Sequence, residues 1–187
     1  MQKIPNISNR VYEFKTGKVF NSHDYPNTHA EQLDSHGAVT LIFMRESETC
    51  KRNAFFNFSK TYNPGCILDL RIAPRLDVFH GSRKLSFDLF SDFGIEYYDF
   101  FGRIGVNSKN DTSEIELRFA EACIYLLSSN KFNSRPIVLF FDNEDIMNEC
   151  CNHIHNLFNL HLLPAKKINM GEFKSGLLSC EPMKARG

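Results

Sequence analysis

Residues 137–141 read IVLFF, and this stretch decides the fold. It is a run of apolar residues of strand length between Pro136 and Asp142, and it does not alternate with polar residues. Strands that are apolar on both faces are typical of parallel sheets, in which helices cover both sides. The stretch therefore predicts a central strand of an α/β protein.

Further apolar runs of strand length occur along the chain, at residues 39–44, 66–70, 95–100 and 161–163. Patterns of helical periodicity separate them, at residues 47–62, 82–94, 112–128 and 142–158. Strands that alternate with helices indicate a mostly parallel sheet. We therefore expect about five strands with helices on both faces, a Rossmann-like three-layer sandwich.

The chain has 187 residues, which is the size of one ordinary domain. Residues 1–37 are polar and predict an irregular N-terminal arm or a short hairpin. Residues 38–164 carry the periodic pattern and predict a single α/β domain. Residues 165–187 form a C-terminal tail whose order the sequence does not predict.

Composition excludes two classes of protein. The 22 Lys and Arg residues balance 22 Asp and Glu residues, so the sequence lacks the basic excess of a general nucleic-acid binder. No apolar stretch approaches the roughly 18–20 residues that span a bilayer, so we expect no membrane association. The first residues lack the continuous apolar stretch that is typical of a secretory signal, and the six cysteines fall within expected strands and helices. These features predict reduced thiols and a cytoplasmic location.

Charge is distributed unevenly along this neutral chain. From Arg71 to Lys84 there are four cations and one anion, whereas residues 111–149 carry eight acids and three cations. The basic segment follows the expected strand at residues 66–70, and loops at the carboxyl ends of parallel strands form the ligand crevice of such sheets. A helix that begins near Ser82 would add the partial positive charge of its N-terminus.

This segment predicts an anion site for a phosphate or a carboxylate, because arginine forks bind such groups. Arg103, between two glycines after the strand at residues 95–100, extends the same basic surface. The candidate ligand-binding residues are Asp69, Arg71, Pro74, Arg75, Ser82, Arg83 and Arg103. The alternative is a solvated loop in which Arg71 is paired with Asp69.

Acidic residues follow the IVLFF strand, at the same carboxyl edge of the sheet as the basic segment. Asp142, Glu144 and Asp145 could bind a metal or act as acid and base. Alternatively, Asp142 or Asn143 caps the next helix, and the acids stabilise its dipole. We favour capping.

Cysteines and histidines later in the same helix resemble metal ligands. They are Cys150, Cys151, His153 and His155, but no second cysteine or histidine pair completes a zinc site. We therefore favour buried cysteines and surface histidines, and we expect no metal and no cofactor. Cys151 and Ser82 are weak candidate nucleophiles, because one lies inside a helix and the other is explained as a helix cap. No catalytic residue is assigned.

Three motifs resemble the bacterial domain of unknown function 488. They are ILDLRIAP at residues 67–74, GIEYYDFFGRIG at residues 94–105, and IVLFF followed by acids and Cys150. Proteins of that family typically carry Asp-Val-Arg-x-x-Pro after a strand, then Gly-Ile-x-Tyr leading to Leu-Gly, then a late strand ending in Cys-x-Glu before Cys-His-Arg. The resemblance covers about residues 39–163.

Residue by residue, the first two motifs agree and the third does not. Asp69, Arg71 and Pro74 match the first motif, and the second is matched by Gly94, Ile95, Tyr97 and Gly105. Phe141 stands in place of the strand-end cysteine, and residues 150–152 read Cys-Cys-Asn in place of Cys-His-Arg. The resemblance implies that part of the family's polar site is lost and that the Arg71 end is kept. It names no reaction.

Two functions follow from the sequence. The first is a pocket for a small phosphorylated or nucleotide-like ligand at the carboxyl edge of the sheet. The alternative is a non-catalytic interaction subunit or regulator of a bacterial protein complex, or a homo-oligomer, which suits the 18 phenylalanines and the opposed charges. Doublets such as Phe100-Phe101 cannot both face inward on a strand, so one ring serves a second packing layer or a partner.

Overall fold

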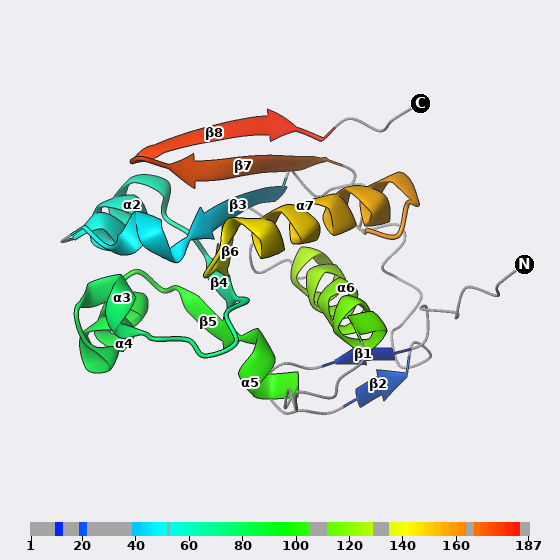
Figure 1. The fold of residues 1–187 in the computed structure, drawn as a ribbon, viewed down its shortest axis with the longest axis horizontal. Helices are drawn as coiled ribbons and strands as arrows, with labels where there is room; N and C mark the ends of the chain where they lie inside the picture. The colour runs from blue at the N-terminus through cyan, green and yellow to red at the C-terminus, as the bar shows by residue number, and fades with distance from the viewer. Residues whose placement is uncertain are drawn as a thin grey trace, which may run out of the picture.

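The structure is a computed structural model, and it describes residues 10–12, 19–21, 39–51, 53–104, 112–128, 135–163 and 167–183. Within the described part of the chain, the main sheet has six strands in the order β5-β4-β6-β3-β7-β8 (Figure 1). They are β3 (Val39–Arg45), β4 (Cys66–Asp69), β5 (Glu96–Asp99), β6 (Ile137–Phe141), β7 (Ile168–Lys174) and β8 (Leu177–Pro182). All neighbours pair in parallel except β8, which is antiparallel to β7.

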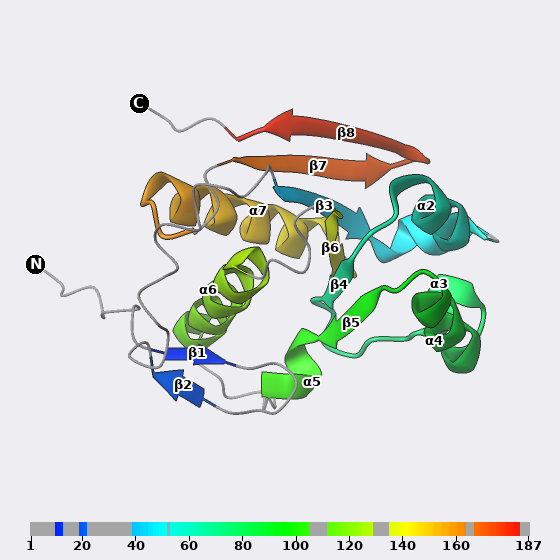
Figure 2. The same ribbon diagram turned by 180° about the vertical axis from the view of Figure 1, so that it is seen from behind.

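Helices cover both faces of this sheet, as Figures 1 and 2 show from opposite sides. One face carries α2 (Ala54–Tyr62), α3 (Asp77–His80) and α4 (Arg83–Asp92). The other face carries α6 (Thr112–Ser128) and α7 (Glu144–Asn159). Two short helices, η4 (Glu46–Thr49) and α5 (Phe100–Ile104), directly follow β3 and β5. The expected three-layer α/β architecture is confirmed, with a mixed sheet because of β8.

The IVLFF strand is central, as the sequence predicts. β6 lies between β4 and β3, and its side chains alternate between two separate hydrophobic cores. Val138 and Phe140 pack with α2, α3 and α4, whereas Ile137, Leu139 and Phe141 pack with α6 and α7. Each of the five is at most 1% exposed, and full burial of such a side chain stabilises by about 1.5–3 kcal/mol. The uninterrupted apolar run is thus explained by the two helical layers.

The sheet also extends beyond the strands that the sequence predicts. The expected strand at residues 161–163 is wrong, because α7 ends there in a turn in which His161 has a φ of 54°. Residues 168–174 and 177–182, assigned to the tail beyond residue 164, instead form β7 and β8. β8 is an edge strand with mostly exposed side chains, so it needs no apolar run. At Gly171, a side chain would collide with Cys180 of β8.

Several smaller expectations concern single elements. The helix expected at residues 47–62 is divided into η4 and α2, with Asn53 in a left-handed conformation between them. Gly94 has a φ of 60° and ends α4, as a C-terminal cap should. In the N-terminal region, β1 (Arg10–Tyr12) pairs antiparallel with β2 (Val19–Asn21), which fits the hairpin alternative. None of the described helices is long and apolar enough to cross a membrane.

Arg135 joins two helix ends to the start of β6. Its guanidinium donates to the carbonyl oxygens of Asn63 and Pro64, which follow α2, and of Phe93 and Gly94, which follow α4, at 2.6–3.1 Å. Carbonyl oxygens at helix C-termini lack partners within the helix and carry partial negative charge. One cation therefore satisfies acceptors from two segments that are distant in sequence.

Candidate functional site

The chain topology creates a crevice at the carboxyl ends of β3, β4 and β6. β3 and β4 are followed by helices on one face of the sheet, whereas β6, which lies between them, is followed by α7 on the other face. Where the connections diverge in this way, an open parallel sheet usually binds its ligand. The residues that end these strands are therefore the first to inspect.

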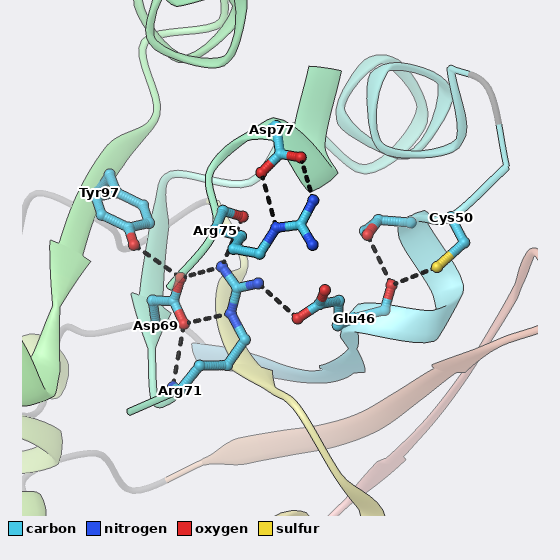
Figure 3. Close-up of polar contacts among 8 residues, drawn as sticks. Glu46, Cys50, Asp69, Arg71, Arg75, Asp77 and Tyr97 are labelled. Atoms are coloured by element: carbon cyan, nitrogen blue, oxygen red, sulfur yellow. Dashed lines mark hydrogen bonds and ion pairs between the residues drawn. The ribbon is translucent and has the colours of Figure 1, made fainter. Parts of the chain in front are cut away.

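In this protein a buried arginine fills the crevice (Figure 3). Asp69 ends β4 and is 0% exposed, and Arg71 follows at 2% exposed. The guanidinium binds this carboxylate through two nitrogens, with Nε at 2.9 Å from Oδ1 and Nη2 at 2.7 Å from Oδ2. Nη1 donates to Glu46 Oε2 at 2.8 Å, and the Tyr97 hydroxyl donates to Asp69 Oδ2 at 2.7 Å. We call these four residues the Arg71 cluster.

Aromatic rings complete the surroundings of the guanidinium. Its central carbon lies 4.7 Å from the ring centroid of Phe140 and 5.6 Å from that of Phe79. Cations over such ring faces are attracted by the ring quadrupole, most strongly when water is excluded. The Arg71 cluster is therefore enclosed by the core beneath α3 as well as by its own carboxylates.

The protonation of the Arg71 cluster follows from its geometry. Burial would lower the pKa of Arg71, but hydrogen bonds and the charges of Asp69 and Glu46 outweigh it and raise that pKa. Burial, the charge of Asp69 and the hydrogen bond to it raise the pKa of Tyr97. Arg71 is thus a permanent cation and Tyr97 a permanent donor. Two carboxylates already surround this guanidinium, so their negative charge would repel an additional anionic ligand.

The other predicted ligand-binding residues lie outside this cluster. Arg75 is paired with Asp77, Nη2 to Oδ2 at 2.7 Å, and the two side chains are 72% and 41% exposed. Its main-chain oxygen accepts from Arg71 Nη2 at 3.3 Å. Pro74 is half-buried in the same loop. The pairing of Arg71 with Asp69 that the solvated-loop alternative expected is present, but both side chains are buried instead of solvated.

The predicted helix start is also in place. Ser82 caps α4, since its hydroxyl accepts from the Leu85 N–H at 3.2 Å. Arg83 is exposed and lies 5.6 Å from the ring centroid of Phe87. Arg103 belongs to α5, but its side chain lies outside the described part of the structure. Of the predicted set, only Asp69 and Arg71 are joined by their side chains among the residues described.

The acids after β6 stabilise local structure. Asn143 caps α7, because its side-chain oxygen accepts from the Ile146 N–H at 2.9 Å. Glu144 pairs with Arg45 at 2.6 Å, which links the end of β3 to α7. The capping interpretation is thus confirmed for Asn143. Among the described residues, no group of three or more histidine, cysteine, aspartate or glutamate side chains could hold a metal ion.

A cavity of about 360 Å³ lies on the face of the sheet that α6 and α7 cover, whereas the Arg71 guanidinium packs against Phe79 and Phe140 on the other face. We call it the α6–α7 pocket. Its lining combines Leu70 and the start of α5, which follow β4 and β5, with residues of α6 and α7. The apolar members are Leu70, Phe100, Phe101, Ile115, Phe119 and Ile146. The polar members are Glu116, Glu149, Asn152, His153 and Asn156, and Cys150 completes the set.

His153 is the polar group that the pocket leaves unsatisfied. Its Nε2 atom is buried and has no hydrogen-bond partner among the described residues. The ring lies 5.8 Å from that of Phe119, which itself packs against Phe100 at 6.2 Å. A buried polar atom without a partner costs roughly 1–3 kcal/mol. A ligand that hydrogen-bonds this nitrogen would recover that free energy.

Cys150 contributes a thiol to the pocket but not a nucleophile. Burial, followed by the charges of Glu149 and Cys151, raises the pKa of Cys150 to about 12. The thiol is therefore protonated at neutral pH, whereas a nucleophilic cysteine needs a lowered pKa. None of the six cysteines, all of which lie in described segments, forms a disulfide, as expected from the sequence.

Sequence reasoning placed a ligand at this edge but missed the residues of the α6–α7 pocket. They come from segments that approach one another only in the folded chain. The Phe100-Phe101 doublet was interpreted on a strand, with one ring directed to a second layer, whereas both residues belong to α5 and both line the pocket. His153 was considered as a metal ligand and favoured as a surface histidine, but its Nε2 atom is buried.

Comparisons with known proteins add no relative. No family model matches the chain, and neither the curated proteins nor the solved structures contain a match. The resemblance to the bacterial domain of unknown function 488 therefore stays a prediction.

Proposed function

We propose that this protein binds a small ligand at the carboxyl edge of its sheet and that the α6–α7 pocket holds it. The observation that carries the proposal is the unpartnered His153 Nε2 in a ring-lined cavity beside the crevice. The crevice itself is filled by the Arg71 cluster. The pocket's volume of about 360 Å³ lies at the lower end of the range for small-molecule sites.

The lining favours a ligand with an aromatic or heteroaromatic ring and no negative charge. Phe100, Phe101 and Phe119 offer ring faces and edges, which bind a planar ring by offset or edge-to-face contact. Glu116 and Glu149 carry negative charge, and no lysine or arginine is among the described lining residues. A ring nitrogen or N–H group would pair with His153. The proposal concerns binding and assigns no reaction.

Benzimidazole and its carboxylate derivative form a matched pair of probes. We expect benzimidazole to raise the melting temperature and to shift the amide NMR signals of Ile115 and Ile146. The carboxylate should bind more weakly. His153→Phe keeps a ring against Phe119 but removes the nitrogen, and should weaken binding roughly tenfold, since such a hydrogen bond contributes about 1.4 kcal/mol. His155→Phe, on the same helix but outside this pocket, is the matched control.

Equal affinity of the two probes would contradict the proposed ligand class. Signal changes that avoid α6 and α7 would contradict the site. A His153→Phe variant that binds benzimidazole as the wild type does would remove His153 from the proposal, because the substitution keeps an aromatic ring but removes both ring nitrogens.

An anion site is a second candidate function, with fewer residues than the sequence predicts. It is supported by two exposed cations: Arg83, the first residue of α4 after its cap Ser82, and Arg75, in the loop before α3. The Arg75–Asp77 pair is open to water, and ion pairs exposed to water contribute little to stability, so an anion can compete for this cation. Thermal-shift assays with sulfate and nucleoside phosphates test it, and Arg83→Gln should abolish any shift. If Arg83→Gln leaves a shift intact, this second site is wrong.

The prediction of an interaction subunit, or of a homo-oligomer, has its own test. Size-exclusion chromatography with mass measurement, and a pull-down from the host, report on it directly. A strict monomer that captures no partner would argue against it.

A further inference from the structure

A second and larger cavity lies on the same face of the sheet, beyond the other flank of α7. It measures about 760 Å³, and its walls are α7 on one side and the β7–β8 hairpin on the other. In Figure 1, α7 crosses the middle of the view, and β3, β7 and β8 lie successively above it. We call this cavity the α7–β8 groove. It shares no described lining residue with the α6–α7 pocket.

An unsatisfied carboxylate lines this groove. Glu172, in β7, has a buried Oε1 atom without a hydrogen-bond partner among the described residues. Glu172 also acts on Cys151, which lines the groove from α7: burial, and then the charge of Glu172, raise the pKa of this thiol. A buried carboxylate oxygen without a donor is costly, and it is most readily satisfied by a cationic donor.

The remaining polar lining strengthens this preference. In the β7–β8 register Glu172 is opposite Ser179 and Met170 is opposite Glu181, so both glutamates are on one face of the hairpin. Both line the groove, and the described lining contains no lysine or arginine. His155 of α7 is therefore the one basic side chain in the described lining.

The apolar part of the groove suits a flexible chain. Met147 of α7, Met170 of β7 and Met183, which directly follows β8, line it. Methionine side chains are unbranched and adapt to irregular shapes. The volume is within the range of about 300–1,000 Å³ that is usual for small-molecule sites. The groove therefore combines a carboxylate end with an adaptable apolar wall.

We propose that the α7–β8 groove is a binding site for an organic cation, a protonated amine that carries a flexible apolar chain. The ammonium group donates to Glu172 Oε1, and Glu181 adds negative charge at the same face. The apolar chain lies along the methionines. This site is independent of the α6–α7 pocket, because the two sites differ in their lining residues and in the ligands proposed for them.

Hexylammonium and hexanol, equal in chain length, test the charge requirement on the unaltered protein. We expect hexylammonium to shift the amide NMR signals of Met170, Glu172 and Ser179, with roughly tenfold tighter binding than hexanol, as charge-assisted hydrogen bonds imply. Glu172→Gln keeps the shape of the side chain and should remove that difference. Asp88→Asn, which removes an exposed carboxylate from α4 on the opposite face, should leave it unchanged.

Three results would overturn the proposal. They are equal binding of hexylammonium and hexanol, signal changes that lie outside the groove, and an unchanged hexylammonium affinity in Glu172→Gln. If Glu172→Gln did not fold, the comparison of the two probes on the wild type would still decide. If His153→Phe loses benzimidazole binding but still binds hexylammonium, the two sites bind their ligands independently.

Discussion

Replacement of Arg71 by methionine should destabilise the protein strongly. The substitution keeps an apolar stem under Phe79 and Phe140 but leaves Asp69, which is 0% exposed, without its guanidinium partner. Removal of one member of a buried ion pair costs about 3–5 kcal/mol, because the remaining charge is uncompensated. At about 2–4 °C per kcal/mol for a chain of this size, the melting temperature should fall by roughly 6–20 °C.

The loss should depend on pH in a defined direction. Without Arg71, the buried Asp69 carboxylate has no countercharge, and burial without a countercharge disfavours the charged form of such a group. A carboxyl group whose folded pKa is raised contributes stability at low pH, and this contribution is lost as pH rises through the folded pKa. The variant should therefore be closer to the wild type at about pH 5 than at about pH 8. Urea unfolding followed by circular dichroism at both pH values measures this.

Two further variants separate charge from packing. Asp69→Asn in the Arg71→Met background should recover part of the stability, because it removes the unpaired charge. Arg71→Lys should lose an intermediate amount, since an ammonium cannot reproduce the two-nitrogen contact with Asp69. If Arg71→Met costs less than about 1 kcal/mol, or if its loss is the same at both pH values, the buried ion pair does not have the role assigned to it.

Three predictions concern other positions. Arg135→Met should cost about 2 kcal/mol in urea unfolding, because carbonyl oxygens after α2 and α4 lose their cationic donor; a loss near zero would contradict the bridging role. Asn143→Ala should cost about 1 kcal/mol through the lost cap of α7, whereas Asp142→Ala should be nearly neutral; the reverse order would contradict the capping interpretation. Mass spectrometry after iodoacetamide treatment should find the exposed Cys50 labelled before Cys150, whose pKa is raised to about 12; equal labelling would contradict that protonation state.

The sequence predicted those parts of the fold in which burial imposes a pattern. β6 is apolar throughout because both of its faces are covered, and α4 carries recognisable signals at Ser82 and Gly94. β7 and β8 were missed because an edge hairpin is half exposed and carries no such pattern. Continuous apolar runs identify strands that both helical layers cover, whereas the β7–β8 hairpin carries no such run.

The candidate site was less predictable, for a different reason. A count of charges along a loop assigns Arg71 to an anion site, but Glu46, distant in sequence, reaches the same guanidinium from the end of β3. Electrostatic partners from other strands cannot be read from a local segment. The unsatisfied atoms of His153 and Glu172 could not be predicted for a similar reason. Whether a side chain has a hydrogen-bond partner depends on segments that only the whole fold brings together.

The most direct measurement is one NMR titration that follows two places at once, the Nε–H signal of Arg71 and the amide signals of Ile115 and Ile146. Because Arg71 Nε is bound to Asp69, phosphate should leave its signal in place, whereas benzimidazole should shift the two amide signals. A phosphate-dependent shift of the Arg71 signal, with no response of the amides to benzimidazole, would show that the crevice is the ligand site and that the α6–α7 pocket is not.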